Sequence, residues 1–261
     1  MAKRLVLACM DRRLNSYLDE NYNDGNTLFL RNAGANAHCL LQSISEAVSN
    51  EIVDSIVILG HTDCGAMKVV FDALANNNMS YSADITNKVI HPFYDYDYLK
   101  DAGAKLNGLG ASERKEAEAE IRRDLEIKNV EMQLSFLKEL TKSFPNINIT
   151  GSIIDLSKIN VPKDNPQHKY SVIFTRECLS KFSDMCNLAH TNPFDTYILM
   201  ASTIKEALVD LEVAVGLFHI RDIKFVVPEK SMSELISSDL DWIKNAANGF
   251  LKDAHISVEH A

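Results

Sequence analysis

The sequence of 261 residues lacks glycine-rich nucleotide-binding motifs, long apolar runs and an excess of positive charge, and each absence argues against a class of protein. It holds ten glycines and neither a G-x-G-x-x-G nor a G-x-x-x-x-G-K-[ST] pattern, so nucleotide-binding loops of these kinds are not supported. No apolar run approaches the roughly 20 residues of a membrane span. The formal charge of −9 argues against a nucleic-acid partner and against binding to an anionic membrane. Hydrophobic residues make up 46% and charged residues 24%, which is typical of a globular protein.

Cysteine is also sparse. The odd number of cysteines and their wide spacing argue against a disulfide framework, which leaves metal binding, catalysis or burial as their roles. The five are Cys9, Cys39, Cys64, Cys178 and Cys186. The apolar run at 5–9 is too short for the core of a signal peptide and soon meets charged residues, so we expect a cytoplasmic protein.

Short apolar runs alternate with helical patterns in the first part of the chain. The runs at 5–9, 27–30 and 55–59 are typical of buried parallel strands. Apolar residues recur at helical spacing over 41–52, between the last two runs. The alternation predicts an α/β fold, with a mostly parallel β-sheet flanked by helices.

The region after these strands is less regular. Residues 75–110 hold an aromatic cluster, and for them we expect irregular structure or short helices. This region would serve as a lid or as a packing insertion. A long helix is expected over 112–140, and a strand over 147–153. The polar segment 161–167 contains two prolines and is the best linker in the chain.

The pattern of the first part starts again after this linker. The segments at 169–184, 196–199 and 223–227 follow their counterparts at a distance of about 166 to 169 residues. We therefore predict a weak internal duplication. The expected organisation is a first domain, a linker and a degenerate repeat, at residues 1–160, 161–168 and 169–261.

Cys9, His61 and Cys64 stand at the C-terminal ends of two predicted strands. Ligands of an open parallel sheet collect outside these ends. Two thiolates and an imidazole suit Zn²⁺, and three protein ligands leave one tetrahedral position open, as in catalytic zinc sites. The pattern H-x-x-C is weak by itself, and burial in the core is the alternative role for each cysteine.

Asp11 and Arg13 strengthen the metal hypothesis. If the backbone stays extended past Cys9, residues 9, 11 and 13 point to one side of the chain. A guanidinium can hold a carboxylate through a bidentate pair, which fixes its direction and keeps it ionised. The alternative is a solvated ion pair in a surface turn.

Three separated motifs resemble the β-class carbonic anhydrases, most closely their compact microbial branch. They are 9–13 (Cys-Met-Asp-Arg-Arg), 31–35 (Arg-Asn-Ala-Gly-Ala) and 60–67 (Gly-His-Thr-Asp-Cys-Gly-Ala-Met). The resemblance covers roughly residues 3–158 and continues at Asn129 and Gln133 on the long helix.

The resemblance implies a β-carbonic-anhydrase-like fold and one Zn²⁺ bound by Cys9, His61 and Cys64. It implies that Asp11 accepts a hydrogen bond from the zinc-bound water and that Arg13 orients Asp11. The implied reaction is the reversible hydration of CO₂ to bicarbonate through a zinc-bound hydroxide. In this family the aspartate can instead bind the metal and close the open position, and the sequence leaves both states open.

The second half lacks the ligand set. In the register of the repeat, Thr175, Pro228 and Ser231 stand at the places of Cys9, His61 and Cys64. We therefore expect one zinc ion per chain and a metal-free second copy. Because the active unit of the family is a dimer, the resemblance implies an intramolecular pseudo-dimer. Assembly into a further homo-oligomer is left open.

Two points separate this chain from the family pattern. Arg12 stands where a small residue is usual, so its cation either narrows the cleft, alters substrate choice or turns into solvent. Loss of ligands in the second half also keeps other functions open. The alternatives are hydrolysis of a CO₂ analogue (COS or CS₂) at the same zinc, and a non-catalytic binding protein on this scaffold.

Overall fold

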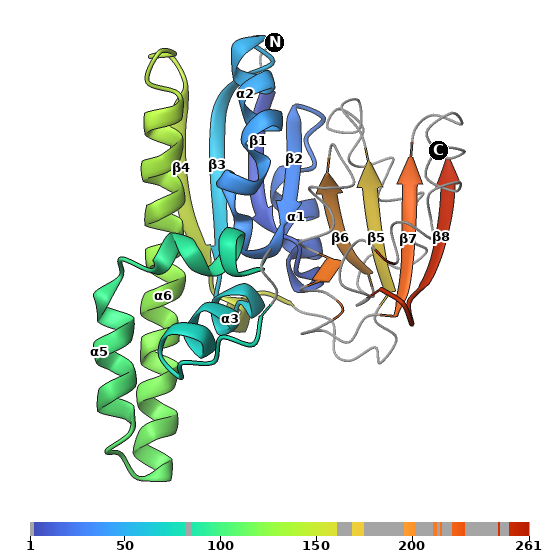
Figure 1. Cartoon of the computed structure of the whole chain (residues 1–261). Helices are drawn as coiled ribbons and strands as arrows, with labels where there is room; N and C mark the ends of the chain where they lie inside the picture. Colours follow the sequence, from blue (N-terminus) through green and yellow to red (C-terminus); the bar gives the residue numbers. More distant parts are fainter. Residues whose placement is uncertain are drawn as a thin grey trace.

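Two parallel four-stranded sheets form the centre of the protein (Figure 1). The computed structural model describes residues 3–81, 85–160, 169–174, 196–201, 211–212, 215, 221–227, 245 and 251–260. Within this part of the chain no helix is long and apolar enough to cross a membrane.

The first sheet contains the predicted strands in the order β2-β1-β3-β4. Their bounds are Lys3–Cys9 for β1, Thr27–Asn32 for β2, Val53–His61 for β3 and Asn148–Ile154 for β4. All neighbours are parallel. Every residue of β2 and the last five of β1 are buried, because both faces of a parallel sheet are covered. The predicted α/β architecture is confirmed here.

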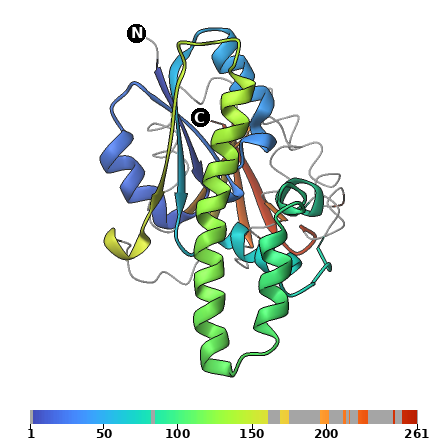
Figure 2. The ribbon, with the colours of Figure 1, turned by 90° about the vertical axis from the view of Figure 1, so that its left-hand side faces the viewer.

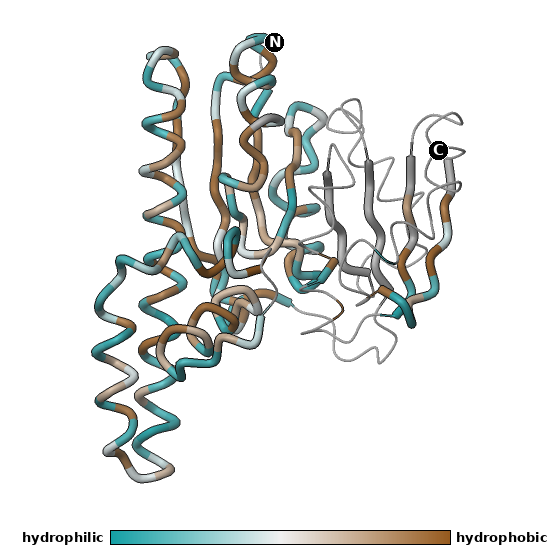
Figure 3. Tube along the Cα trace, in the orientation of Figure 1, coloured by the Kyte–Doolittle hydropathy of each residue, from teal (hydrophilic) through white to brown (hydrophobic). Residues whose placement is uncertain are grey.

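Helices pack on the two faces of this sheet. They are α1 (Asn15–Tyr22), α2 (Leu41–Ser49), α3 (Gly65–Leu74) and α6 (Ala111–Leu140), whereas α5 (Asp97–Leu106) packs on α3 and α6. Alternate residues of β1 enter different cores: Val6 lies with α3, whereas Leu5 lies with α2. Figure 3 shows β1 and β3 as mostly hydrophobic and the outer parts of α5 and α6 as mixed.

Helix α6 lies close against β3 and β4 (Figure 2). Glycines on the strands permit this approach. A Cβ added at Gly60 would lie 2.5 Å from Cγ2 of Val130, and one at Gly151 would lie 2.9 Å from Cγ1 of the same residue. The first half of α6 extends beyond the sheet together with α5, and the two helices form a hairpin.

The region 75–110 forms short helices, as predicted, in its described parts. A π-helical turn (Thr86–Ile90) and a 3₁₀ turn (His91–Phe93) precede α5. Ile90, Phe93 and Leu99 are at most 2% exposed and join the core. These contacts support the packing insertion rather than the lid.

The second sheet has the order β6-β5-β7-β8. Its strands are β5 (Lys169–Phe174), β6 (Thr196–Ala201), β7 (Asp222–Val227) and β8 (His255–His260). The two sheets have the same strand order. In each, the second strand of its half lies at one edge, and the first, third and fourth strands follow across the sheet. Strand β6 contacts β2, and the two sheets run in opposite directions, since β1 begins and β8 ends at the same side (Figure 1).

The two halves share one apolar core. Phe225 and Leu251 are wholly buried and belong to the same cluster as Leu14 and Leu18 of the first half. The predicted boundary at 161–168 lies outside the described residues. So do Thr175, Pro228 and Ser231, which replace the ligands in the predicted repeat.

Candidate metal centre

The structure brings Cys9, His61 and Cys64 together. Cys9 ends β1, His61 ends β3, and Cys64 is the residue before α3. Their ligand atoms all lie within 4.8 Å of one another, and all three side chains are buried. Neighbouring strand ends converge at this edge of the sheet, as the topology requires.

His61 presents one ring nitrogen to this cluster. Its Nδ1 lies 2.9 Å from the carbonyl oxygen of Thr62, which can only accept, so Nδ1 carries the proton. Its Nε2 is buried and is the one buried side-chain nitrogen or oxygen without a hydrogen-bond partner among the described residues. A buried ring nitrogen without a hydrogen-bond partner, beside two sulfurs, fits a metal ion.

The two thiols shift each other's pKa in opposite directions. A hydrogen bond from Cys64, together with the charge of His61, holds the pKa of Cys9 well below its ordinary value. The hydrogen bond with Cys9, together with burial, raises the pKa of Cys64 well above its ordinary value. The negative charge of Cys9 contributes to raising the pKa of His61 to about 9, against the effect of burial. A bound dication would let both thiols ionise, which is the donor set that Zn²⁺ requires.

Asp11 and Arg13 form the predicted pair, but through a different backbone. The chain turns after Cys9 into a 3₁₀ helix (Arg12–Leu14), so the expected extended run to residue 13 is wrong. The Asp11 side chain caps this turn by accepting the backbone N–H of Arg13 at 3.0 Å. The Arg13 guanidinium donates from Nη2 to Asp11 Oδ2 at 2.6 Å and from Nε to Oδ1 at 3.0 Å.

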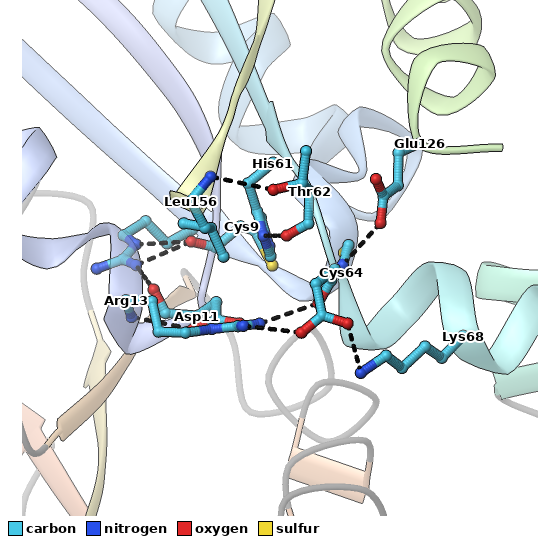
Figure 4. A network of polar contacts seen from close by, with 11 residues as sticks. Cys9, Asp11, Arg13, His61, Thr62, Cys64, Lys68, Glu126 and Leu156 are labelled. Atoms are coloured by element: carbon cyan, nitrogen blue, oxygen red, sulfur yellow. Dashed lines mark hydrogen bonds and ion pairs between the residues drawn. The ribbon is translucent and has the colours of Figure 1, made fainter. Parts of the chain in front are cut away.

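This pairing keeps Asp11 ionised. Burial opposes ionisation, since the side chain is 1% exposed, but the hydrogen bonds and charge of Arg13 outweigh it. The pKa of Asp11 therefore lies below its ordinary value. The result is a fixed carboxylate beside the three ligands (Figure 4).

Asp63 is a second carboxylate on Arg13. Its Oδ2 accepts from Arg13 Nη1 at 3.0 Å, and its carbonyl oxygen accepts from Nη2 at 2.9 Å. Its Oδ1 lies 2.8 Å from Nζ of Lys68 on α3. Burial alone would raise the pKa of Asp63. Its hydrogen bonds with Lys68 and Arg13 outweigh this effect, so the pKa of Asp63 lies below its ordinary value.

The motif at 31–35 makes hydrogen bonds and close contacts with the segments that carry the candidate ligands. The wholly buried Arg31 donates from Nη2 to the carbonyl oxygens of Cys9 and Asp11, at 2.9 and 2.8 Å. Gly34 has φ +75°, and a Cβ there would lie 3.1 Å from Cβ of Ala66, so both backbone and space favour glycine. Asn129 Nδ2 donates to the Gly34 carbonyl at 2.7 Å.

Sequence reasoning missed Glu126. This residue of α6 is 6% exposed, and its Oε1 accepts the backbone N–H of Cys64 at 3.0 Å. Burial raises the pKa of Glu126. Together with Gly34, Met67 and Asn129, Glu126 lines a tight cavity at the three ligands. Its position on the buried stripe of α6, next to Leu125, was the available signal, because a carboxylate rarely occupies such a stripe without a role.

His38 lies apart from the ligand cluster. It stacks on Phe136 with ring centroids 3.6 Å apart, and it lines a separate cavity of about 490 Å³ with Lys88 and His91. These contacts give His38 a packing role in the structure.

A family model described as "Carbonic anhydrase" matches residues 4–161. No curated protein matches the chain. Among solved structures, a tetrameric β-carbonic anhydrase from Sordaria macrospora is 17% identical; the match covers 60% of this chain and 77% of that chain, with a TM-score of 0.43. The β-carbonic anhydrase CafA of Aspergillus fumigatus is 18% identical; the match covers 73% of this chain and 84% of that chain, with a TM-score of 0.43. A carbonic anhydrase from Glaciozyma antarctica is 20% identical; the match covers 59% of this chain and 77% of that chain, with a TM-score of 0.35.

Proposed function

The chain belongs to the β-class carbonic anhydrase family, and on this basis we propose that it catalyses the reversible hydration of CO₂ to bicarbonate at a zinc ion held by Cys9, His61 and Cys64. The observation that carries the proposal is the convergence of three buried donor atoms within 4.8 Å, one of them the unpartnered Nε2 of His61. When bound, Zn²⁺ supplies a Lewis acid with an open coordination position and lowers the pKa of a water there towards about 7.

The side chains around the cluster have separate tasks. Asp11 is an ionised acceptor whose direction Arg13 fixes, so it can hold and orient a proton-bearing group next to the metal. The carbonyl of Thr62 keeps the proton of His61 on Nδ1 and leaves Nε2 to bind. Arg13 would also restrain Asp11 from moving onto a bound metal ion, since that movement would break their bidentate contact.

Zinc content and stopped-flow CO₂ hydration, measured on the same preparation, test the proposal. We expect about one zinc per chain, with hydration that falls by a factor of about 100 or more in Asp11→Asn while zinc is retained. A chain without zinc, or a zinc-loaded chain without CO₂ turnover, would contradict it. Turnover of COS or CS₂ instead would favour the analogue hydrolase, and zinc with neither activity would favour a binding protein.

We further propose that the second sheet is a metal-free copy of the first, which gives an intramolecular pseudo-dimer with a single zinc site. Three features support this: the equivalent strand order, the opposite direction of the two sheets, and the contact of β2 with β6, each the second strand of its half. The 3₁₀ turn that carries Arg13 also contacts β6. The second half would thus take the place of a partner subunit beside the site.

Zinc stoichiometry and molecular mass in solution test this arrangement. We expect one zinc per 29.2 kDa chain, whether the chain is a monomer or assembles into a larger homo-oligomer. Two zinc ions per chain would contradict the metal-free copy. An experimental structure without a twofold relation between the sheets would contradict the duplication.

A further inference from the structure

The guanidinium of Arg13 joins two segments that are far apart in the sequence. On one edge, Nε and Nη2 donate to the carboxylate of Asp11, which follows the ligand Cys9. On the other edge, Nη1 donates to Oδ2 of Asp63, and Nη2 also donates to its carbonyl oxygen. Asp63 stands between the ligands His61 and Cys64, so one side chain connects both ligand-bearing loops (Figure 4).

The backbone of Asp63 is arranged for this contact. Its φ is +59°, in the left-handed region that non-glycine residues adopt at a cost, and that asparagine and aspartate tolerate better than most. In this conformation both the carbonyl and the carboxylate of Asp63 reach Arg13. Lys68 pairs with the remaining carboxylate oxygen, Oδ1, which leaves Oδ2 for Arg13.

We propose that Asp63 is a positioning residue: it anchors Arg13 to the loop between His61 and Cys64, so that Arg13 both orients Asp11 and holds the two ligand loops at a fixed separation. This inference rests on the proposed zinc site. The pair Arg13–Asp63 is named here the loop clamp. The alternative is a half-exposed ion pair with no influence on the metal, since the Arg13 and Asp63 side chains are 26% and 53% exposed.

The loop clamp predicts faster loss of zinc when the Asp63 carboxylate is removed. Partners that hold metal-ligand segments affect metal affinity by roughly 10–100-fold, and solvent exposure places Asp63 at the lower end. In the zinc-loaded full chain, we expect Asp63→Asn to release zinc to a chelator about tenfold faster than the wild type. Asparagine suits the left-handed backbone, so this variant changes the charge more than the fold.

Two further variants separate the contact from its surroundings. Asp63→Gly relieves the backbone but deletes the carboxylate, and we expect it to release zinc at least as fast as Asp63→Asn; slower release than in the wild type would show that backbone strain, not the clamp, matters. Lys68→Met is the matched control, because it removes a charge partner of Asp63 without touching Arg13. We expect its zinc release within about twofold of the wild type.

A double-mutant cycle tests whether Asp63 acts through Arg13. In an Arg13→Gln background, we expect Asp63→Asn to change zinc release by less than about twofold. The absorption spectrum of the Co²⁺-loaded chain, which responds to the ligand set, should change in the same direction in Arg13→Gln and in Asp63→Asn. An equal factor in both backgrounds, or an unchanged spectrum in Asp63→Asn, would overturn the clamp.

The outcomes also separate this inference from the proposed function. A wild-type chain that binds no zinc overturns the zinc site and the clamp with it. A wild-type chain that binds zinc and hydrates CO₂, with unchanged zinc release in Asp63→Asn, overturns the clamp alone.

Discussion

Arg31, wholly buried, donates hydrogen bonds from Nε and Nη2 to the carbonyl oxygen of Cys9, at 3.0 and 2.9 Å. It also donates from Nη1 to Oδ1 of Asn15 at 2.6 Å. The backbone of the first ligand is thus held by a cation that comes from β2 rather than from its own strand. The fork of the guanidinium serves several acceptors at once, which a lysine ammonium cannot reproduce in the same geometry.

We therefore predict that Arg31→Lys lowers the free energy of unfolding by about 2–4 kcal/mol, because it leaves buried carbonyl groups without donors. Urea denaturation measures the change. Arg4→Lys is the control, since Arg4 makes a 3.8 Å contact with Asp24 at the surface, and it should cost less than about 0.5 kcal/mol. Equal effects of the two substitutions would contradict a special role for Arg31.

Glu126 gives a second prediction. Glu126→Ala leaves the buried N–H of Cys64 without its acceptor, and we expect a loss of about 1–3 kcal/mol in the free energy of unfolding. Glu126→Gln keeps an amide oxygen for this hydrogen bond and should retain most of the stability. Thermal and urea unfolding of both variants provide the comparison. If both lose the same stability, the negative charge matters and the hydrogen bond to Cys64 does not explain the burial of this residue.

Much of the first sheet could be predicted from the sequence, because strands buried on both faces are continuous apolar runs. The strands at 5–9, 27–30 and 55–59 were found for this reason, and the long helix was found from its length and periodicity. Helix α3 and strand β8 were not predicted. Helix α3 is almost wholly buried and apolar on most sides, so it lacks the polar face that distinguishes a surface helix.

The three candidate ligands were predictable because Cys9 and His61 end strands, because Cys64 follows β3 by three residues, and because cysteine and histidine carry distinct chemistry. The residues that hold these side chains in place were harder to predict from the sequence. In the sequence, Asp63 and Glu126 look like ordinary acidic residues. The role of Asp63 depends on its contact with Arg13, 50 positions away. The role of Glu126 depends on its contact with Cys64, 62 positions away. The turn at Arg12–Leu14 replaced the expected extended backbone because Asp11 caps it with its own side chain.

The close packing of α6 on the sheet yields a third prediction. In Gly151→Ala, the new Cβ would lie 2.9 Å from side-chain carbons of both Val130 and Leu134. We expect this overpacking to cost about 1–3 kcal/mol, measured by urea denaturation. Gly108→Ala is the control, because its nearest neighbour, the carbonyl oxygen of Lys105, lies at an ordinary 3.8 Å. A stable Gly151→Ala variant would mean that α6 moves away from β4 at little cost.

Removal of the metal gives a fourth prediction. A ligand that binds only the folded state stabilises it, by about 2.7 kcal/mol when its free concentration is 100 times its Kd. We expect addition of zinc to the chelator-treated chain to raise its melting temperature, and the same addition to leave Cys64→Ala unchanged. Cys39→Ala is the matched control, because Cys39 lies outside the ligand cluster and should keep the response. Equal responses of the two cysteine variants would exclude Cys64 as a ligand.

His38 provides a fifth prediction, on pH. Burial lowers the pKa of His38 in the folded chain, where its ring stacks on Phe136. The unfolded state, with an ordinary pKa of about 6.5, therefore takes up a proton at a higher pH than the folded state. The contribution of His38 to stability is absent above about pH 7 and becomes unfavourable as the pH falls through 6.5.

His38→Phe keeps a ring against Phe136 but cannot take up a proton, so it should lose less stability than the wild type as the pH falls. Urea denaturation of the two proteins between about pH 5 and 8 measures this difference, which we expect to be small because His38 is exposed to solvent on one side of its stack with Phe136. The variant should become more stable relative to the wild type below about pH 6.5, and the gain should level off once the folded chain also binds the proton. Parallel curves for the two proteins would mean that His38 titrates alike in both states and that stacking on Phe136 does not withdraw it from water.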